Sequence, residues 1–229
     1  MSYLLEILGR GLLTDIAAAF GDVLRDDGRR SLKQIEVDLE SNPENIDFQR
    51  RFALRMLADR QYGRAQSSFE SVLTARPEDR PARLGLACTL DKLGRTRAAL
   101  EYLKKAYEQS PKDGPTLLAL AFCLEKLGET DDAVRLYEAA LECAHELRPA
   151  HERLAAIHLK RDNIPRAIEQ YEHVCFITPD DISAALTLAN LYLRGGRADD
   201  AIRRFQFAIT IDPDNWEAQA DLVAAHAQA

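Results

Sequence analysis

Eight of the nine prolines in this chain of 229 residues lie on two ladders with a step of 34 residues. The first ladder is Pro43, Pro77, Pro111, Pro179 and Pro213, with His145 at the step between Pro111 and Pro179. The second ladder is Pro81, Pro115 and Pro149. A fixed period of this length is typical of a stacked array of similar units, in which each unit packs on its neighbours.

The period divides residues 46–215 into five units, which are 46–79, 80–113, 114–147, 148–181 and 182–215. Positions 8 and 20 are alanine in every unit, and positions 7 and 24 are large apolar residues. Positions 20, 24 and 27 have the spacing of one helical face. Columns of small residues beside columns of large ones indicate helices that pack closely together.

Glycine and proline positions predict two helices in each unit. Gly94, Gly128 and Gly196 stand at position 15, where the end of a helix favours a left-handed residue. Pro81, Pro115 and Pro149 fall in the first turn of the first helix, where a missing N–H costs nothing. The prolines that close each unit end its second helix.

The repeat length, the small-residue columns and the closing proline resemble the tetratricopeptide repeat over residues 46–215. The resemblance implies an all-α fold, a right-handed solenoid of five to six helix-turn-helix repeats. The chain departs from the family pattern at position 4, where an aromatic residue is often found, and His145 replaces a closing proline. The residues at position 4 are Gln49, Arg83, Leu117, His151 and Ala185.

The flanks extend this array at both ends. Residues 1–45 form an N-terminal segment, in which residues 29–42 resemble the second helix of a degenerate repeat, and residues 216–229 are compatible with a capping helix. Apolar residues recur every fourth position near the start, at Leu4, Leu8, Leu12, Ile16 and Phe20. We expect residues 1–24 to pack on the first repeats, to enter a groove or to mediate homo-oligomers. Binding to a membrane surface is disfavoured, because Asp15, Asp22 and the lone Arg10 give no basic face.

Composition argues against several classes of function. A net charge of −7 disfavours nucleic acid as a partner, and no apolar run is long enough for a membrane span. The four cysteines form no CxxC pair, and no secretory signal is evident, so a cytoplasmic location is expected. No catalytic or cofactor-binding motif is present, which predicts neither enzyme activity, nor a cofactor, nor a metal.

Three groups of polar or reactive residues are interpreted as structural. His151 and His158 are seven residues apart, which is too far for a compact pair of metal ligands, so they are assigned to the core or its rim. Cys88 and Cys123 are interpreted as small apolar fillers. Arginines clustered in the first unit are assigned to a solvated face that also contains Asp47 and Asp59; they are Arg50, Arg51, Arg55, Arg60 and Arg64.

The resemblance further implies that positions 5, 9, 12 and 13 of the first helices line a concave groove. We expect Leu84, Leu118 and Phe122 to face solvent there as an apolar patch. A row of cations at position 13 would run along this patch; the alternative interpretation is that these cations compensate the dipoles at the helix C-termini. The predicted groove residues are Leu54, Leu84, Cys88, Lys92, Leu118, Phe122, Lys126, Lys160, Leu186, Asn190 and Arg194. Arg50 and Leu54 replace the Lys and Asn with which the chaperone-docking subclass grips a carboxylate, so that subclass is disfavoured.

These observations predict a non-catalytic scaffold that binds a peptide or helix of a partner protein in the groove. A self-assembling homo-oligomer that uses the apolar N-terminal segment is the first alternative. An accessory domain of an enzyme is the second.

Overall fold

The computed structural model describes residues 32–227, and within this range the secondary structure consists of twelve α-helices without a strand. The fold class predicted from the sequence is therefore correct. The expectations for residues 1–31 lie outside the described part of the chain. The chain divides into two compact units after His145, here called the N-terminal unit and the C-terminal unit. No helix in residues 32–227 has the length and apolar character needed to cross a membrane.

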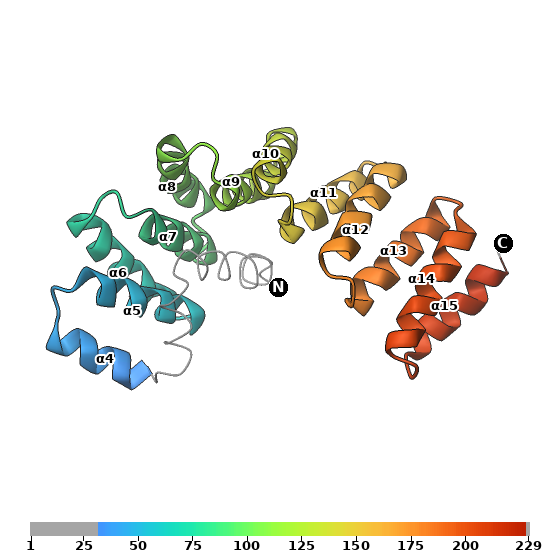
Figure 1. The fold of residues 1–229 in the computed structure, drawn as a ribbon. Helices are drawn as coiled ribbons and strands as arrows, with labels where there is room; N and C mark the ends of the chain where they lie inside the picture. Colours follow the sequence, from blue (N-terminus) through green and yellow to red (C-terminus); the bar gives the residue numbers. More distant parts are fainter. Residues whose placement is uncertain (1–31, 228–229) are drawn as a thin grey trace. The chain divides into compact units, whose positions relative to one another are not determined.

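The N-terminal unit is a stack of helices in which each packs mainly on its neighbours in the chain. Helices α5, α7 and α9 line one side of this unit and α6, α8 and α10 the other (Figure 1). The helices are α4 (Leu32–Ser41), α5 (Ile46–Ala58), α6 (Tyr62–Ala75), α7 (Arg80–Lys92), α8 (Thr96–Gln109), α9 (Gly114–Lys126) and α10 (Thr130–Cys143).

The C-terminal unit repeats the same arrangement of alternating first and second helices. Its closest packing is between α11 and α12 and between α13 and α14, and α15 packs on α14. The helices are α11 (Arg148–Lys160), α12 (Ile164–Ile177), α13 (Ile182–Arg194), α14 (Ala198–Ile211) and α15 (Trp216–His226).

The residue that precedes a first helix caps its N-terminus in several repeats. The side chains of Asp79, Asp113 and Asp181 accept hydrogen bonds from backbone N–H groups in the first turns of α7, α9 and α13. Such a cap satisfies a donor that has no partner within the helix. The prolines of the second ladder occupy the first turns of α7, α9 and α11, as predicted.

The turn between the two helices of a repeat has one conformation in all five repeats. Gly94, Gly128 and Gly196 have φ values of 77°, 89° and 72°, which confirms the left-handed residue predicted at position 15. Arg60 and Asp162 occupy the same position and are also left-handed, with φ of 60° and 55°. In each repeat the following N–H donates to a carbonyl five residues earlier, for example Gln61 N to Met56 O at 2.8 Å. This hydrogen bond belongs to the Schellman motif, so the motif imposes the conformation even without glycine.

The core of both units consists of the small and large columns. The alanines at positions 8 and 20 are at most 1% exposed in every repeat, so the helix backbones approach closely there. Phe69, Tyr137 and Phe205 at position 24 are fully buried beside them. Four of the five residues at position 4 are also buried, and among them Arg83 donates to Gln109 and to the carbonyl of Pro77. Since a buried guanidinium needs such acceptors, they explain how Arg83 replaces an aromatic residue.

Candidate functional site

The inner face of each unit is defined here by positions 5, 9, 12 and 13 of its first helices. Spacings of four, three and one place these positions on one side of a helix. Seven predicted groove residues belong to the N-terminal unit: Leu54, Leu84, Cys88, Lys92, Leu118, Phe122 and Lys126. Four belong to the C-terminal unit: Lys160, Leu186, Asn190 and Arg194.

The apolar residues on the inner face of the N-terminal unit are buried, which corrects the expectation that they face solvent. Leu84, Leu118 and Phe122 are 3%, 2% and 8% exposed, and Leu54 is 2% exposed. Leu54, Leu84 and Phe122 belong to the hydrophobic core cluster of this unit, and Cys88 packs against it. Burial of these apolar side chains stabilises the unit. The structure therefore offers no open apolar patch at these residues.

Polar residues at positions 12 and 13 form a charge network across two repeats of the N-terminal unit. Asp91, which is 3% exposed, accepts hydrogen bonds at Oδ1 from Thr96 Oγ1 and Lys126 Nζ, both at 2.7 Å. Its Oδ2 is buried without a hydrogen-bond partner. Burial lowers the pKa of the neighbouring Lys92, and the charge of Asp91 opposes this shift. Asp91 therefore lies inside the unit and links α7 to α9 through Lys126.

The two cysteines of this region have the environment of structural thiols. Burial raises the pKa of the Cys88 thiol to about 12, with a further contribution from the charge of Asp91. Burial also raises the pKa of Cys123. Because the thiolate is the nucleophile, these thiols are chemically quiet, as the sequence indicated.

The inner face of the C-terminal unit is more accessible than that of the N-terminal unit. Leu186 at position 5 is half-buried and Asn190 at position 9 is exposed, as are the cations Lys160 and Arg194. Asn190 Nδ2 donates to Asp221 Oδ2 on α15 at 3.4 Å. Leucines at position 12 of both first helices, Leu159 and Leu193, are half-buried as well. In this unit half-buried leucines therefore occur on the same helices as exposed cations.

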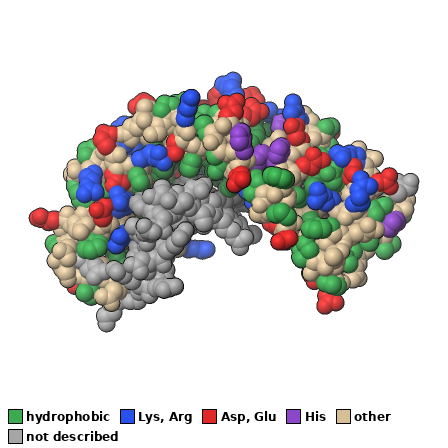
Figure 2. Space-filling model, viewed as in Figure 1, with side chains coloured by type: hydrophobic (Ala, Val, Ile, Leu, Met, Phe, Trp, Pro, Cys, Tyr) green, Lys and Arg blue, Asp and Glu red, His purple; other side chains and the backbone are tan. Residues whose placement is uncertain are grey.

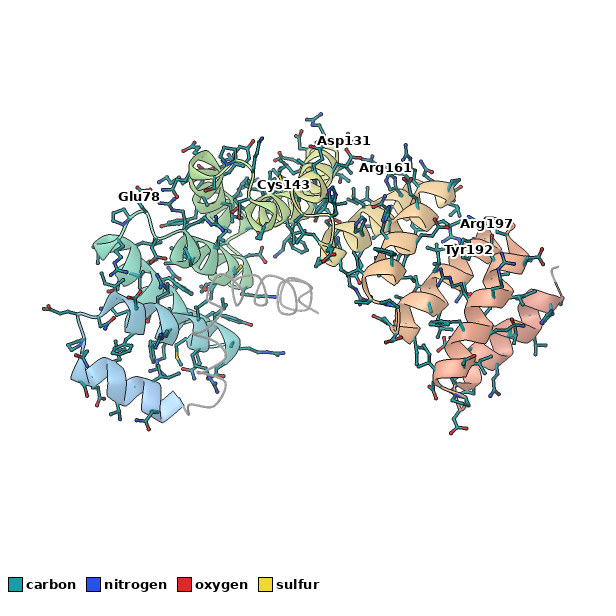
Figure 3. The ribbon with its side chains drawn as sticks, viewed as in Figure 1. Glu78, Asp131, Cys143, Arg161, Tyr192 and Arg197 are labelled. Atoms are coloured by element: carbon teal, nitrogen blue, oxygen red, sulfur yellow. The ribbon has the colours of Figure 1, made fainter. Side chains whose placement is uncertain are left out.

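The C-terminal unit contains a polar cluster of its own, which the sequence analysis did not predict. The Tyr192 hydroxyl donates to Glu172 Oε1 at 2.7 Å, and the Arg197 guanidinium lies 4.4 Å from the centre of the Tyr192 ring (Figure 3). Burial raises the pKa of Tyr192 to about 12, with a further rise from the hydrogen bond to Glu172. The cluster joins α12 and α13 to the start of α14. Its only signal in the sequence was a tyrosine near the end of a helix.

Three of the five clustered arginines in the first unit, Arg50, Arg55 and Arg64, form ion pairs with acidic side chains within residues 32–227. Arg50 contacts Asp47 at 2.8 Å and Asp79 at 2.5 Å. Arg55 pairs with its neighbour Asp59, and Arg64 pairs across helices with Glu36; both distances are 2.9 Å. Basic and acidic side chains are interspersed on the face shown in Figure 2. The side chains of Arg55 and Arg64 are 37% and 50% exposed, in line with the predicted solvated face, whereas that of Arg50 is only 18% exposed.

The histidines that were considered as metal ligands have other contacts. His151 is buried, its Nδ1 lies 2.8 Å from Gln170 Oε1, and its ring stacks on His173 with centroids 4.8 Å apart. No group of three or more His, Cys, Asp or Glu side chains within residues 32–227 is placed to hold a metal ion. The arrangement of His151 is that of a packed core residue.

Comparison with known families decides which fold family this is. A family model described as tetratricopeptide repeat matches residues 51–114 and 186–229, and a second model with the same description matches residues 92–157. The chain is a tetratricopeptide repeat protein. The matched segments overlap both units, so the repeat family accounts for the helix pairs of each.

Solved structures of other tetratricopeptide repeat proteins share this fold at low sequence identity. A crystal structure of MamA aligns with a TM-score of 0.62 at 20% identity, covering 76% of this chain and 96% of MamA. TTC0263, a thermophilic protein from Thermus thermophilus, aligns with a TM-score of 0.57 at 21% identity, covering 80% and 99%. YrrB, described as having an unusual peptide-binding site, aligns with a TM-score of 0.57 at 18% identity, covering 83% and 98%. No curated protein sequence matches the chain significantly.

Proposed function

We propose that this tetratricopeptide repeat protein is a non-catalytic scaffold whose inner face binds an extended or helical segment of a partner protein. The observation that supports the proposal is the inner face of the C-terminal unit, where half-buried leucines adjoin exposed cations. Leu186 supplies apolar surface, and Lys160 and Arg194 supply positive charge. A preformed helical stack needs little ordering when it binds, which favours recognition of a flexible segment. The structurally similar YrrB is described as having a peptide-binding site, which is consistent with this function.

The chemistry of the inner face specifies the ligand. Leu186, Leu159 and Leu193 are half-buried, so an apolar side chain of the ligand would remove their remaining surface from water. Lys160 and Arg194 favour acidic residues beside that anchor and raise the association rate more than the affinity. The expected ligand is therefore a segment with apolar anchors flanked by Asp or Glu.

The N-terminal unit contributes differently under this proposal. Lys126 is 44% exposed at its side chain and available to an acidic ligand, although it is paired with Asp91. Leu84, Leu118 and Phe122 are buried, so they offer little apolar surface to a ligand. Self-assembly, in which residues 1–24 of a second copy bind an inner face, remains the alternative function.

Selection from a display library of random peptides against the full chain tests the proposed function. We expect selected peptides to combine apolar and acidic residues and to bind more weakly at high salt. The variant Lys160→Glu/Arg194→Glu should lose this binding. The control variant Arg166→Glu/Arg203→Glu changes the same net charge on exposed residues of the second helices and should retain it.

Two outcomes contradict the proposal. One is a selection that yields no binding peptide, and the other is binding that the Lys160→Glu/Arg194→Glu variant leaves unchanged. Light scattering on the chain alone decides the alternative, since self-assembly requires a mass that grows with concentration. Enzymatic turnover without any added partner would revive the accessory-domain alternative.

A further inference from the structure

A cavity of about 310 Å³ lies in the N-terminal unit between α4, α5 and α6, which are neighbours in Figure 1. Its apolar lining consists of Leu39 on α4, Pro43 after α4 and Phe52 on α5. Gln49 on α5 and three serines of α6 complete the lining; the serines are Ser67, Ser68 and Ser71. The volume is at the small end of the range for ligand pockets, which suits a single ring better than a larger molecule.

The second repeat has a tyrosine at the corresponding place. The apolar lining of the cavity has counterparts 34 residues later, which are Leu73, Pro77 and Leu86. Ser68, at position 23, has Tyr102 as its counterpart, and Tyr102 is half-buried and packs against the hydrophobic core cluster. Position 23 is also large in the other three repeats, with Leu136, Gln170 and Arg204. The serine of the first repeat therefore leaves open the place that corresponds to the Tyr102 ring.

The apolar lining favours an aromatic occupant over an aliphatic one. Leu39 is half-buried and Pro43 is exposed, so a ring placed between them removes apolar surface from water. Phe52 contributes its own ring to the lining. A second ring beside it is stabilised beyond the burial of its area, because the edge of one aromatic ring attracts the face of another.

The polar part of the lining favours a neutral hydroxyl group on that ring. Ser71 Oγ donates to Gln49 Oε1 at 3.2 Å, and Gln49 Nε2 donates to Pro43 O at 2.6 Å. A hydroxyl that donates one hydrogen bond still has lone pairs that accept another, so Ser71 can accept from a phenol. All seven lining residues are uncharged, so an anionic ring such as phosphotyrosine has no ion-pair partner there.

We infer that the cavity between α4, α5 and α6 is a binding site for the side chain of a tyrosine on a partner protein. Tyr102 in the second repeat is the internal precedent for this occupant. The site is separate from the inner face, because none of the lining residues stands at position 5, 9, 12 or 13 of a repeat. The inference therefore goes beyond the proposed function and does not depend on it.

Amide NMR spectra of the full chain test the site with a defined probe. The probe is the tripeptide Gly-Tyr-Gly with both ends blocked, and the blocked tripeptide Gly-Leu-Gly is its control. Gly-Tyr-Gly should shift the backbone amide signals of Ser67, Ser68 and Ser71. Because only one side chain is buried, we expect saturation at a probe concentration on the order of 10 mM. Gly-Leu-Gly should bind more weakly by roughly threefold or more.

Filling the cavity from within should abolish these shifts. Ser68→Tyr copies the second repeat, and Ser68→Leu copies the third, where Leu136 stands at position 23. Both variants should keep the helical circular dichroism of the wild type and lose measurable binding of Gly-Tyr-Gly. The control variant Thr74→Tyr adds the same ring at an exposed position of α6 that does not line the cavity, and it should bind like the wild type.

A free phenol, para-cresol, separates a tyrosine side chain from a small-molecule ligand. If the cavity takes the side chain of a partner protein, Gly-Tyr-Gly should bind at least as tightly as para-cresol. Shifts with para-cresol and none with Gly-Tyr-Gly would overturn the assignment to a tyrosine of a partner.

Three other outcomes also overturn the inference. The first is that Gly-Tyr-Gly leaves the three serine amide signals unchanged, and the second is that Gly-Leu-Gly binds equally well. The third is that the folded Ser68 variants still bind Gly-Tyr-Gly, or that Thr74→Tyr loses binding as they do. Failure of the peptide-library selection affects only the proposed function, and failure of these experiments leaves that function intact.

Discussion

Gly85 offers a sharp test of how the repeats pack, because two effects of opposite sign meet at this residue. It lies inside α7 and is buried, and it faces the fully buried ring of Phe69 on α6. A Cβ added at Gly85 would lie 2.4 Å from Phe69 Cζ and 2.6 Å from its Cε1. Gly85→Ala therefore raises the helix propensity of α7 but overpacks the contact between α6 and α7.

The magnitudes decide the sign of the net effect. Replacing glycine by alanine within a helix contributes about 1 kcal/mol of stability. Overpacking a buried site costs about 1–3 kcal/mol, and the upper part of that range applies because the Phe69 ring has no solvent into which it can move. The net expectation for Gly85→Ala is a destabilisation of about 1–2 kcal/mol.

Chemical denaturation followed by circular dichroism measures this change. Gly63→Ala on α6 is the matched control, because no atom lies within 4 Å of its added Cβ, and it should stabilise by about 0.5–1 kcal/mol. Phe69→Leu/Gly85→Ala should recover part of the lost stability, since the next repeat has Leu103 and Ala119 at the same two positions. The reasoning is refuted if Gly85→Ala stabilises the protein as Gly63→Ala does.

Three further changes test other parts of the fold by the same denaturation assay. Ala121→Leu should destabilise by about 1–3 kcal/mol, because Ala121 is fully buried in the small-residue column; an unchanged unfolding curve would contradict the helix register. Arg60→Gly should stabilise by about 0.5–1 kcal/mol, because its φ of 60° suits glycine; a destabilisation would contradict this. Tyr192→Phe should cost about 1 kcal/mol below pH 10. Since the pKa of Tyr192 is raised from 10.0 to about 12, its contribution disappears as pH rises through that interval, and the variant should approach the wild type there.

The fold could be predicted from the sequence because the same residue types recur at the same positions in five repeats. Alanine at positions 8 and 20 predicted close helix contacts, and these residues are at most 1% exposed. Glycine at position 15 predicted a left-handed turn in three repeats. The sequence did not reveal that Arg60 and Asp162 adopt the same conformation, because the Schellman hydrogen bonds that impose it depend on the finished helix.

The burial of the inner face could not be predicted in the same way. Periodicity shows which residues share a side of a helix, and it placed Leu84 and Leu186 in one column. Burial depends on what packs against that column, and the two leucines differ although their position in the repeat is the same. Asp91 shows the same limit, because its position in the repeat does not reveal that it is buried and accepts a hydrogen bond from a lysine of the next repeat.

The cationic row at position 13 has two candidate roles, stabilisation of the helix ends and the proposed recognition of a ligand, and one measurement separates them. Lys160 and Arg194 lie in the last turns of α11 and α13, where a cation stabilises the helix dipole by about 0.3–1 kcal/mol. Replacing both by glutamine should therefore lower the free energy of unfolding by about 0.6–2 kcal/mol, whether or not a ligand exists. If the row also recognises a ligand, a selected peptide should associate more slowly with the Lys160→Gln/Arg194→Gln variant, and this decrease should not depend on how stable the variant is. If Lys160→Gln/Arg194→Gln loses stability while a selected peptide associates with it at the wild-type rate, the row serves the helices alone.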